Sequence, residues 1–420
     1  MNLRKTILAS DSRSINAAVE SSIRSSRYDE KQRAILRAAT LAFNQDGVRG
    51  ANLSAIARAV GLTTASITYY YKKKEELAAA CFLQGIATYD KINRAPVDLA
   101  DARDRVFALV ERHFEFRREI ALKRHAPPIL FDDIRTLSSP HSIPVASAYV
   151  DMFRHLRKLL FRDCSPSALS RMERNARTHL VLGCLLWLPA WLAYRDPEDY
   201  IFDARHFSDL IVNGFADATQ QLKPTESVVS IATRDTSPRE EFLRAATYLI
   251  NEHGYHGASV DKISAQLNVS KGSFYHHNQT KDELVLECFE RTIAVIRQAQ
   301  SEGRSLPGSG IDRLRATCAA LAEYQLSKNG PLLRSTALLT LPETSRRHMI
   351  ARMNRLSARF TDMITDGIID GSIRRVDAQI GGQLINPMIN GAAELQHWAP
   401  GVTAGKVTDI YIDPLLRGLF

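Results

Sequence analysis

The sequence lacks the features of several large protein classes. Its five cysteines include no Cys-x-x-Cys pair, and an odd count without framework spacing favours reduced thiols that fill gaps in a core. The longest apolar block, residues 181–188, stops at Pro189 and is too short to cross a bilayer. Residues 1–27 contain no apolar run of the length that a secretory signal needs. We therefore expect a soluble, cytoplasmic protein with no membrane partner.

Catalytic and metal-binding motifs are missing as well. The sequence has no nucleophile elbow, no glycine-rich phosphate loop and no His-Glu-x-x-His motif. His253 with His256, and His276 with His277, stand without the Cys or carboxylate spacing of a zinc site. No segment shows the sustained alternation of apolar and polar residues that marks a strand. The sequence thus predicts an all-α protein that is not an enzyme and needs no metal or other cofactor.

Positive charge and length are what the chain does have. Lys and Arg number 55 against 46 Asp and Glu, which gives a net charge of +9 over 420 residues. This balance favours an anionic partner, with nucleic acid ahead of a membrane surface. The length exceeds what one domain usually needs, and a hydrophobic content of 45% lets several units bury a core.

An internal repeat is the most informative feature. Residues 34–82 return as residues 241–289 at a constant offset of 207, and 16 of the 49 aligned pairs are identical. The chain therefore carries two copies of one module.

Each copy has the pattern of three short helices. The first ends before a glycine, Gly47 or Gly254, as a left-handed C-terminal cap requires. Asn52 and Ser259 stand at the N-cap of the second helix, and a tight turn then leads to the third. Two short helices joined by such a turn form a helix-turn-helix, which places its second helix in the major groove of DNA.

The last helix of each copy carries outward residues that suit a DNA-reading role. Small or polar residues at its start allow a close approach to the bases, and the aromatic and histidine groups that follow can reach phosphate oxygens. The first set is Thr63, Thr64, Ala65, Ser66, Tyr69 and Tyr70, and the second is Ser270, Lys271, Gly272, Ser273, Tyr275, His276 and His277.

Residues 52–77 and 259–284 resemble the N-terminal signature of the TetR/AcrR family of bacterial transcriptional regulators. The resemblance covers about 50 residues of each half, and the remainder fits the family only in length and helicity. It implies a tandem duplication of the whole repressor unit, in which each copy has a three-helix DNA-binding domain and a larger helical effector domain. Proteins of this family usually act as homodimers on palindromic operators.

The resemblance also implies roles for individual residues. Base contacts fall on Thr64, Ala65, Ser66 and Tyr69 in the first copy and on Lys271, Gly272, Ser273 and His276 in the second. Phosphate contacts fall on Asn52, Tyr70 and Lys74 and on Ser259, Tyr275, His277 and Lys281. Thr68, Ala65 and Asn278 depart from the family pattern, which usually has tyrosine, glycine and an aromatic residue there.

The repeat suggests an order of domains. We expect a flexible basic arm over residues 1–28, a first helix-turn-helix domain over 29–76 and a first effector-binding or dimerisation domain over 77–222. A linker over 223–237 then joins a second helix-turn-helix domain, 238–283, to a second effector-binding or dimerisation domain, 284–420.

The effector halves carry little that identifies a ligand. Trp187 and Trp191 lie four residues apart in a very apolar segment and share one helix face. They are interpreted as part of a pocket for an apolar small-molecule effector, as part of a dimer interface, or as ordinary core.

The sequence as a whole indicates a ligand-responsive transcriptional regulator, in the first place a repressor, whose partner is a double-stranded DNA operator. The two readers differ at most outward positions, so a single chain could act as an intramolecular pseudo-dimer on an asymmetric site; a homodimer of tandem chains is the rival arrangement. The alternative function is that of a non-specific, nucleoid-type DNA-binding protein.

Overall fold

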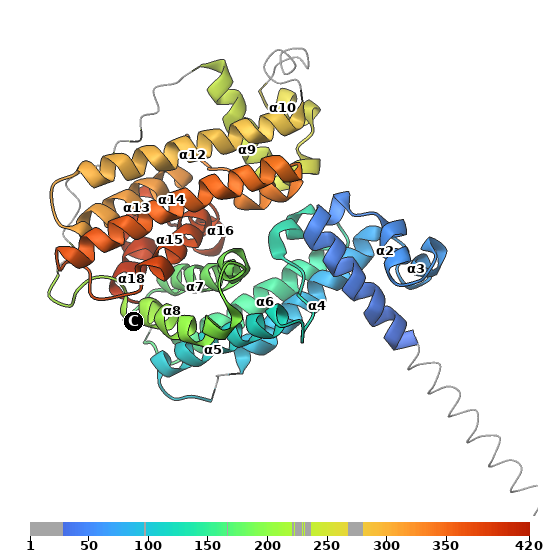
Figure 1. Ribbon diagram of the computed structural model, residues 1–420, viewed down its shortest axis with the longest axis horizontal. Coiled ribbons are helices and arrows are strands. Elements are labelled where there is room, and N and C mark those ends of the chain that lie inside the picture. Colours follow the sequence, from blue (N-terminus) through green and yellow to red (C-terminus); the bar gives the residue numbers. More distant parts are fainter. Residues whose placement is uncertain are drawn as a thin grey trace, which may run out of the picture. The chain divides into compact units, whose positions relative to one another are not determined.

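The computed structural model describes residues 28–95, 98–165, 167–220, 222, 229, 231, 237–267 and 280–420. Within these ranges the regular elements are helices, and the only β-type pairing is an isolated antiparallel bridge between Ala216 and Ile373. This confirms the predicted all-α fold (Figure 1). Residues 1–27 of the expected arm, most of the expected linker and the segment expected to form the second reader helix lie outside the described residues. No helix within them is long and apolar enough to cross a membrane.

The chain divides into two compact units. One consists of the residues up to Gly85 together with Pro127–Ser142, and the other of Ile86–Ala126 together with Ile143–Phe420. The first unit therefore contains the first helix-turn-helix. The second unit contains the second repeat with its effector half and most of the first effector half.

The first unit begins with a helix over residues 28–50, in which Gly47 has φ 71°. Helices α2 (Leu53–Ala59) and α3 (Thr64–Tyr70), the first turns of α4 (Lys74–Arg94) and a 3₁₀ helix, η1 (Phe131–Thr136), follow. The Asn44 side chain ties the first helix to the segment before η1, because its Nδ2 donates to Pro128 O at 2.9 Å and its Oδ1 accepts from Leu130 N at 2.8 Å. Fully buried Ile35, Phe82 and other apolar residues form the core.

The second unit contains the helices of both effector halves. In the first half these are α5 (Ala102–Ala121), α6 (Ser142–Phe161), α7 (Arg171–Leu192), η2 (Pro197–Asp199) and α8 (Tyr200–Asn213). In the second repeat they are α9 (Pro238–Gly257), α10 (Val260–Gln266), α12 (Lys281–Ser305), α13 (Gly310–Leu326), η3 (Ser335–Thr340), α14 (Glu343–Ile369), α15 (Ala378–Ala392), α16 (Leu395–Trp398), α17 (Ala404–Val407), η4 (Thr408–Ile412) and α18 (Asp413–Arg417).

The duplication extends into the effector halves. The offset of 207 relates Lys74, the first residue of α4, to Lys281, the first residue of α12, and it relates Arg171 of α7 to Ala378 of α15. Two buried cysteines repeat the same contact, since Cys81 Sγ lies 3.7 Å from Leu36 O and Cys288 Sγ lies 3.6 Å from Leu243 O. All five cysteines are free and four of them are buried, as expected of core residues.

Helix α8 ends earlier than the sequence suggests. The apolar pattern predicts a helix over residues 204–222, but α8 stops at Asn213 because Gly214 takes φ 71° and turns the chain. The segment that follows is extended instead. Phe215 N and Ala216 N both donate to Leu416 O at 2.8 Å.

The two effector halves pack against each other within the chain, mainly through α7 and α15 (Figure 1). His179 Nε2 lies 3.0 Å from Gly391 O, and Asn175 Nδ2 donates to Trp398 O at 2.8 Å. Close backbone contact completes the interface, because a Cβ atom on Gly214 would lie 2.4 Å from Gly418 N. The halves thus form one continuous core.

Candidate DNA-reading surface and effector core

The first reader helix, α3, is built by local interactions that the sequence predicts. Gly61 has φ 66° in the turn, and the Thr63 hydroxyl caps the helix by accepting from Ser66 N at 3.2 Å. Ile67 is fully buried and anchors α3 to the core, as expected of its single inward residue. One side of this seven-residue helix is therefore held inward while the opposite side stays free.

The residues expected to contact bases lie together on that free side. Thr64 and Ala65 are exposed, Ser66 is half-buried, and Tyr69 is 77% exposed. The Thr64 hydroxyl lies 3.1 Å from that of Ser54, and rotatable hydroxyls of this kind can exchange partners. The arrangement suits reading of base edges, and the contacts themselves stay a prediction.

Two of the expected phosphate-binding residues flank this surface. Asn52 is the N-cap of α2, and its Oδ1 accepts from Ser54 N at 2.8 Å, so its Nδ2 group is left for an external acceptor. The Tyr70 ring packs against Tyr28, with ring centroids 4.7 Å apart. Partial burial and the neighbouring Tyr28 raise the pKa of the Tyr70 hydroxyl, so it stays protonated and can donate to a phosphate oxygen.

Lys74 and Lys281 have a structural role that the sequence analysis missed. Lys74 Nζ donates to Arg49 O at 2.7 Å and to Ala51 O at 3.0 Å, and burial lowers the pKa of its ammonium group. Its repeat counterpart Lys281 donates to Tyr255 O and lies 4.2 Å from the centre of the Tyr255 ring. Both lysines bind carbonyl groups where the first helix of the repeat ends. The last carbonyl groups of a helix have no hydrogen-bond partner within it, and this general property could have indicated the contact with the lysine.

The second reader is described only in part. Ser259 caps α10, since its hydroxyl accepts from Lys262 N at 3.3 Å, and Ile263 is fully buried like its counterpart Ile56. The remaining site residues of this reader lie outside the described residues: Lys271, Gly272, Ser273, Tyr275, His276 and His277.

The two tryptophans of α7 lie in or beside the core of the first effector half. Trp191 is 6% exposed, and its ring centroid is 6.0 Å from that of Phe114 on α5. Trp187 is half-buried. The buried Nε1 atoms of both residues lack a hydrogen-bond partner in the described part of the chain.

A buried polar cluster on α4 and α5 was not foreseen. His113 Nε2 lies 2.9 Å from Asn93 Oδ1, and Arg117 donates to the Tyr89 hydroxyl. Burial, and then the charge of Arg117, lower the pKa of His113 to about 3, so this imidazole is neutral. His113 and Arg117 continue the inward stripe of α5 at a spacing of four residues, which is the sequence signal that could have located them.

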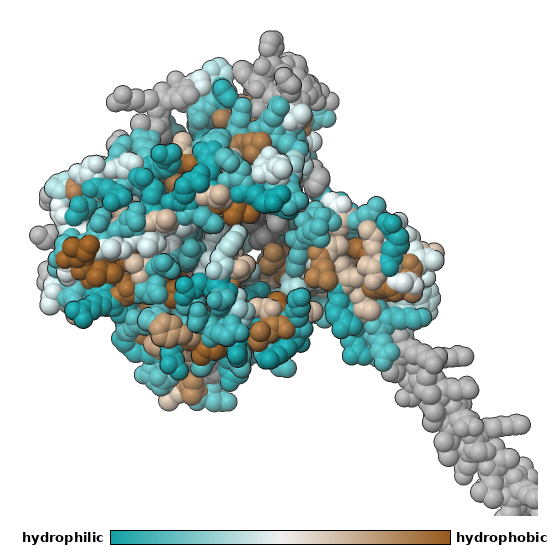
Figure 2. All heavy atoms as spheres, in the orientation of Figure 1, coloured by the Kyte–Doolittle hydropathy of each residue, from teal (hydrophilic) through white to brown (hydrophobic). Residues whose placement is uncertain are grey.

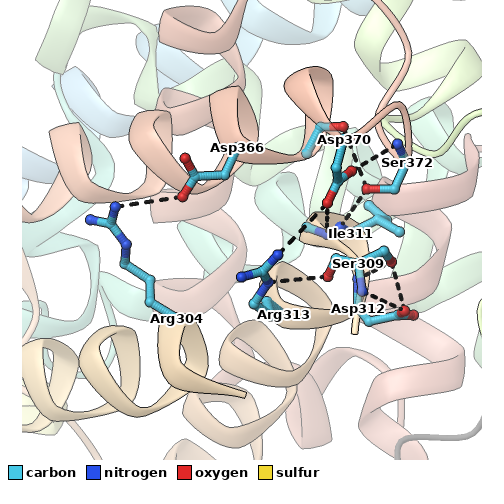
Figure 3. A network of polar contacts seen from close by, with 10 residues as sticks. Arg304, Ser309, Ile311, Asp312, Arg313, Asp366, Asp370 and Ser372 are labelled. Carbon is cyan, nitrogen blue, oxygen red and sulfur yellow. Dashed lines mark hydrogen bonds and ion pairs between the residues drawn. The ribbon is translucent and has the colours of Figure 1, made fainter. Parts of the chain in front are cut away.

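Arginines line a groove on the second effector half. Its volume is about 350 Å³, and the residues around it are Ile293, Arg297, Arg352, Arg355, Leu356, Ala358, Arg359 and Asp362. Figure 2 shows that hydrophilic residues cover much of the face that α12 and α14 present in this view. Further along α12 and α14, Arg304 Nη2 lies 3.5 Å from Asp366 Oδ2, and Arg313 Nη2 of the neighbouring α13 lies 3.7 Å from Asp370 Oδ2 (Figure 3).

No group of three or more His, Cys, Asp or Glu side chains is placed to hold a metal ion within the described ranges.

The family model for bacterial regulatory proteins of the tetR family matches residues 35–81 and 242–288, and that for the tetracyclin repressor-like C-terminal domain matches residues 307–419. The HTH-type transcriptional repressor DhaR of Mycobacterium sp. (strain GP1) is 30% identical over 145 residues, which cover 33% of this chain and 72% of DhaR. The chain belongs to the TetR family. It is a transcriptional regulator with two copies of the family's helix-turn-helix.

Other proteins also match part of the chain. The Tn10 TetC protein of Escherichia coli is 35% identical over 60 residues, 14% of this chain and 30% of TetC. Among solved structures, PfmR of Thermus thermophilus is 25% identical and covers 43% of this chain and 98% of its own, with a TM-score of 0.37. Bacillus subtilis FadR, solved with stearoyl-CoA, is 17% identical and covers 43% of this chain and 100% of its own, with a TM-score of 0.36. Each solved chain therefore spans less than half of this one.

Proposed function

We propose that this TetR-family chain is a cytoplasmic, ligand-responsive repressor that binds an asymmetric operator as a covalent pseudo-dimer. The observation that carries the proposal is the packing of α7 against α15, which joins the two effector halves within one polypeptide. A covalent link makes the pairing of the halves intramolecular and independent of protein concentration. The role as a repressor accords with relatives such as DhaR, which is named a repressor.

Differences between the readers support an asymmetric operator. Thr64 and Ala65 correspond to Lys271 and Gly272, and Tyr69 corresponds to His276. A lysine can hydrogen-bond to guanine, whereas a threonine methyl group suits thymine, so the two helices favour different half-sites. Half-sites usually lie about 34–36 Å apart. The linker over 223–237 could span about 50 Å when extended and so does not forbid this spacing.

The proposed DNA contacts are those that the family resemblance implies, and the exposure of Thr64, Ala65 and Tyr69 supports them in the first reader. The base contacts are Thr64, Ala65, Ser66 and Tyr69, with Lys271, Gly272, Ser273 and His276 in the second reader. The phosphate contacts are Asn52, Tyr70 and Lys74, with Ser259, Tyr275, His277 and Lys281 in the second.

The proposed response to a ligand depends on the fourth helix of each copy. Helix α4 begins with Lys74, beside the reader, and carries Tyr89 and Asn93 of the effector core near its other end. A ligand that favours one position of this helix shifts the protein between DNA-binding and DNA-free states by its difference in affinity for the two.

The test is to select bound sequences from a random DNA pool and then to weigh the complex by native mass spectrometry. One chain on an operator with two unlike half-sites is the expected result. Two chains on one operator would establish the homodimer of tandem chains instead. No enrichment of any sequence over the starting pool would favour the nucleoid-type alternative.

Two substitutions separate the proposed roles within the first reader. Ser66→Ala should relax sequence choice, since it removes a base contact. Lys74→Met should weaken binding to all sequences and reduce the slope of log affinity against log salt by about 1, because it removes one phosphate contact. An unchanged salt slope for Lys74→Met would leave this lysine with only its contacts to the Arg49 and Ala51 carbonyls.

A further inference from the structure

Arg117 is a buried cation without a carboxylate partner. It is 8% exposed, its guanidinium donates to the Tyr89 hydroxyl and lies 5.7 Å from the centre of the Tyr89 ring, and no ion pair joins it to an aspartate or glutamate among the described residues. Burial of a charge without a counter-charge is costly, so proteins seldom retain one without a reason. An anion that is not part of the chain would remove this cost.

Two buried hydrogen-bond donors of the first effector half have no acceptor among the described residues. Asn93 is 1% exposed, and its Nδ2 has no partner within the described ranges, although its Oδ1 lies 2.9 Å from His113. The Nε1 atom of Trp191 is also buried and unpaired. Buried polar groups nearly always have partners, and these two atoms are both N–H donors. The cluster as a whole therefore lacks acceptors.

Ring contacts join Arg117, Tyr89 and His113, because the His113 ring stacks on that of Tyr89 with centroids 5.9 Å apart and Arg117 lies over the same tyrosine. Phe114, the residue after His113, packs against Trp191, and it packs against Phe207 of α8 with ring centroids 5.4 Å apart. The polar cluster and Trp191 are thus both joined to α5 in the first effector half.

The second effector half neutralises its own buried arginine. Position 324, the repeat counterpart of Arg117, is a tyrosine, and it contacts a buried arginine of α12, Arg291. Arg291 donates to Glu240 Oε1 at 2.6 Å, to the Tyr324 hydroxyl at 2.8 Å and to Asn329 O at 2.6 Å. The chain itself supplies the acceptors that the first half lacks.

We propose that the first effector half binds an organic carboxylate with an apolar body, that Arg117, Asn93 Nδ2 and Trp191 Nε1 hold its oxygens, and that the corresponding region of the second half binds no such ligand. The inference rests on the proposed ligand-responsive function and names the chemical class of the effector. It also assigns sensing to one of the two halves. The aromatic rings of Phe114 and Phe207 suit the apolar body.

The first experiment measures binding of simple probes to the full-length chain. Straight-chain carboxylates from butyrate to dodecanoate are each compared with the corresponding primary amide, by calorimetry and by the shift in melting temperature. We expect at least one carboxylate to bind and to raise the melting temperature, while its amide binds about tenfold more weakly or worse, because hydrogen bonds to a charged group are the stronger ones. Absence of binding throughout the series, or equal binding of acids and amides, overturns the proposal.

The second experiment applies one substitution at two sites. Arg117→Met should abolish carboxylate binding and leave the melting temperature unchanged or higher, because it removes an uncompensated buried charge. Arg291→Met should lower the melting temperature, because it leaves Glu240 without its partner, and the carboxylate should still bind wherever the variant stays folded. If Arg117→Met destabilises the protein as much as Arg291→Met does, Arg117 is structural and the proposal fails.

Two further variants localise the bound anion. Trp191→Phe keeps a ring against Phe114 but removes the indole N–H, so it should weaken carboxylate binding several-fold. Arg355→Gln, in the arginine-lined groove between α12 and α14, is the control and should bind as the unmodified chain does. Loss of binding in Arg355→Gln with retention in Arg117→Met would place the anion in the groove and overturn the assignment.

Gel shifts with selected operator DNA keep this inference separate from the proposed function. Carboxylate binding by a chain that binds no DNA would refute the repressor and leave the site intact. DNA binding without carboxylate binding would overturn the carboxylate site and leave the proposed repressor function intact.

Discussion

The two effector halves use equivalent positions for different purposes. Trp191 packs against Phe114 within its own half, whereas its repeat counterpart Trp398 stacks on Phe153 of the other half, with ring centroids 4.3 Å apart. In a symmetric dimer every interface contact occurs twice, because both subunits present the same surface. Covalent fusion removes that requirement. Each half of this chain could therefore diverge. The first carries buried Arg117, which no described carboxylate neutralises, and the second carries buried Arg291, which Glu240 neutralises.

The largest effect is expected where the halves cross. Gly214→Ala should cost roughly 3 kcal/mol or more, because the new Cβ would lie 2.4 Å from Gly418 N and Gly214 also has a positive φ. Gly61→Ala is the matched control, since Gly61 also has a positive φ but nothing lies within 4 Å of the added atom; it should cost only about 1–2 kcal/mol. Denaturant unfolding measures both. Equal losses of stability in the two variants would mean that the contact between Gly214 and Gly418 is not tightly packed.

Making the readers alike should change the operator. Thr64→Lys combined with Ala65→Gly gives the first reader the residues of the second at these positions. We expect selection from random DNA to shift towards operators with two similar half-sites. The free-energy difference between the preferred base and the others should change by about 1–3 kcal/mol at the base pairs that positions 64 and 65 contact. Tyr194→Ala, a change at an exposed residue of the first effector half, is the control. An unchanged operator would remove these two positions from the proposed base contacts.

Acid should loosen the first effector half before the second. Burial holds the pKa of His113 at about 3, below its unfolded value near 6.5, so the unfolded state takes up a proton that the folded state does not. Stability is then complete above about pH 6.5 and falls with decreasing pH towards 3, by at most about 1.4 kcal/mol per pH unit. The repeat counterpart of His113 is Ala320, which cannot titrate.

Hydrogen exchange of α5 and α13 at several pH values tests this asymmetry. Protection of α5 should decrease first on acidification, and His113→Gln should remove the difference between the two helices. Parallel loss of protection in both helices would contradict the assignment to His113.

The smallest effect separates the two tryptophans. A double-mutant cycle on Trp398 and Phe153 should give a coupling energy of about 0.5–1.5 kcal/mol, as measured for aromatic pairs. The repeat-equivalent cycle on Trp191 and Phe360 should give a value near zero, because Trp191 packs on Phe114 instead. Similar coupling energies in both cycles would contradict the asymmetric packing of the two tryptophans.

Local features were predictable from the residues alone. Asn52 and Thr63 cap their helices, and Gly47 and Gly61 take positive φ, because these outcomes depend on neighbours within a few residues. The same holds for the inward position of Ile67. The position of Lys74 on the Arg49 carbonyl was missed because its partner lies 25 residues away.

The amino-acid sequence by itself determined the duplication, the helical class and the two readers, since repeats, periodicity and capping are properties of short segments. Only the tertiary structure decided that α7 packs on α15 and that Trp398 crosses to the other half while Trp191 packs within its own. It also decided that Arg117 lies buried with no carboxylate partner among the described residues. These outcomes depend on which distant segments share a core. The spacing of apolar residues shows which side of a helix faces the core, but it does not show which other helix that side packs against.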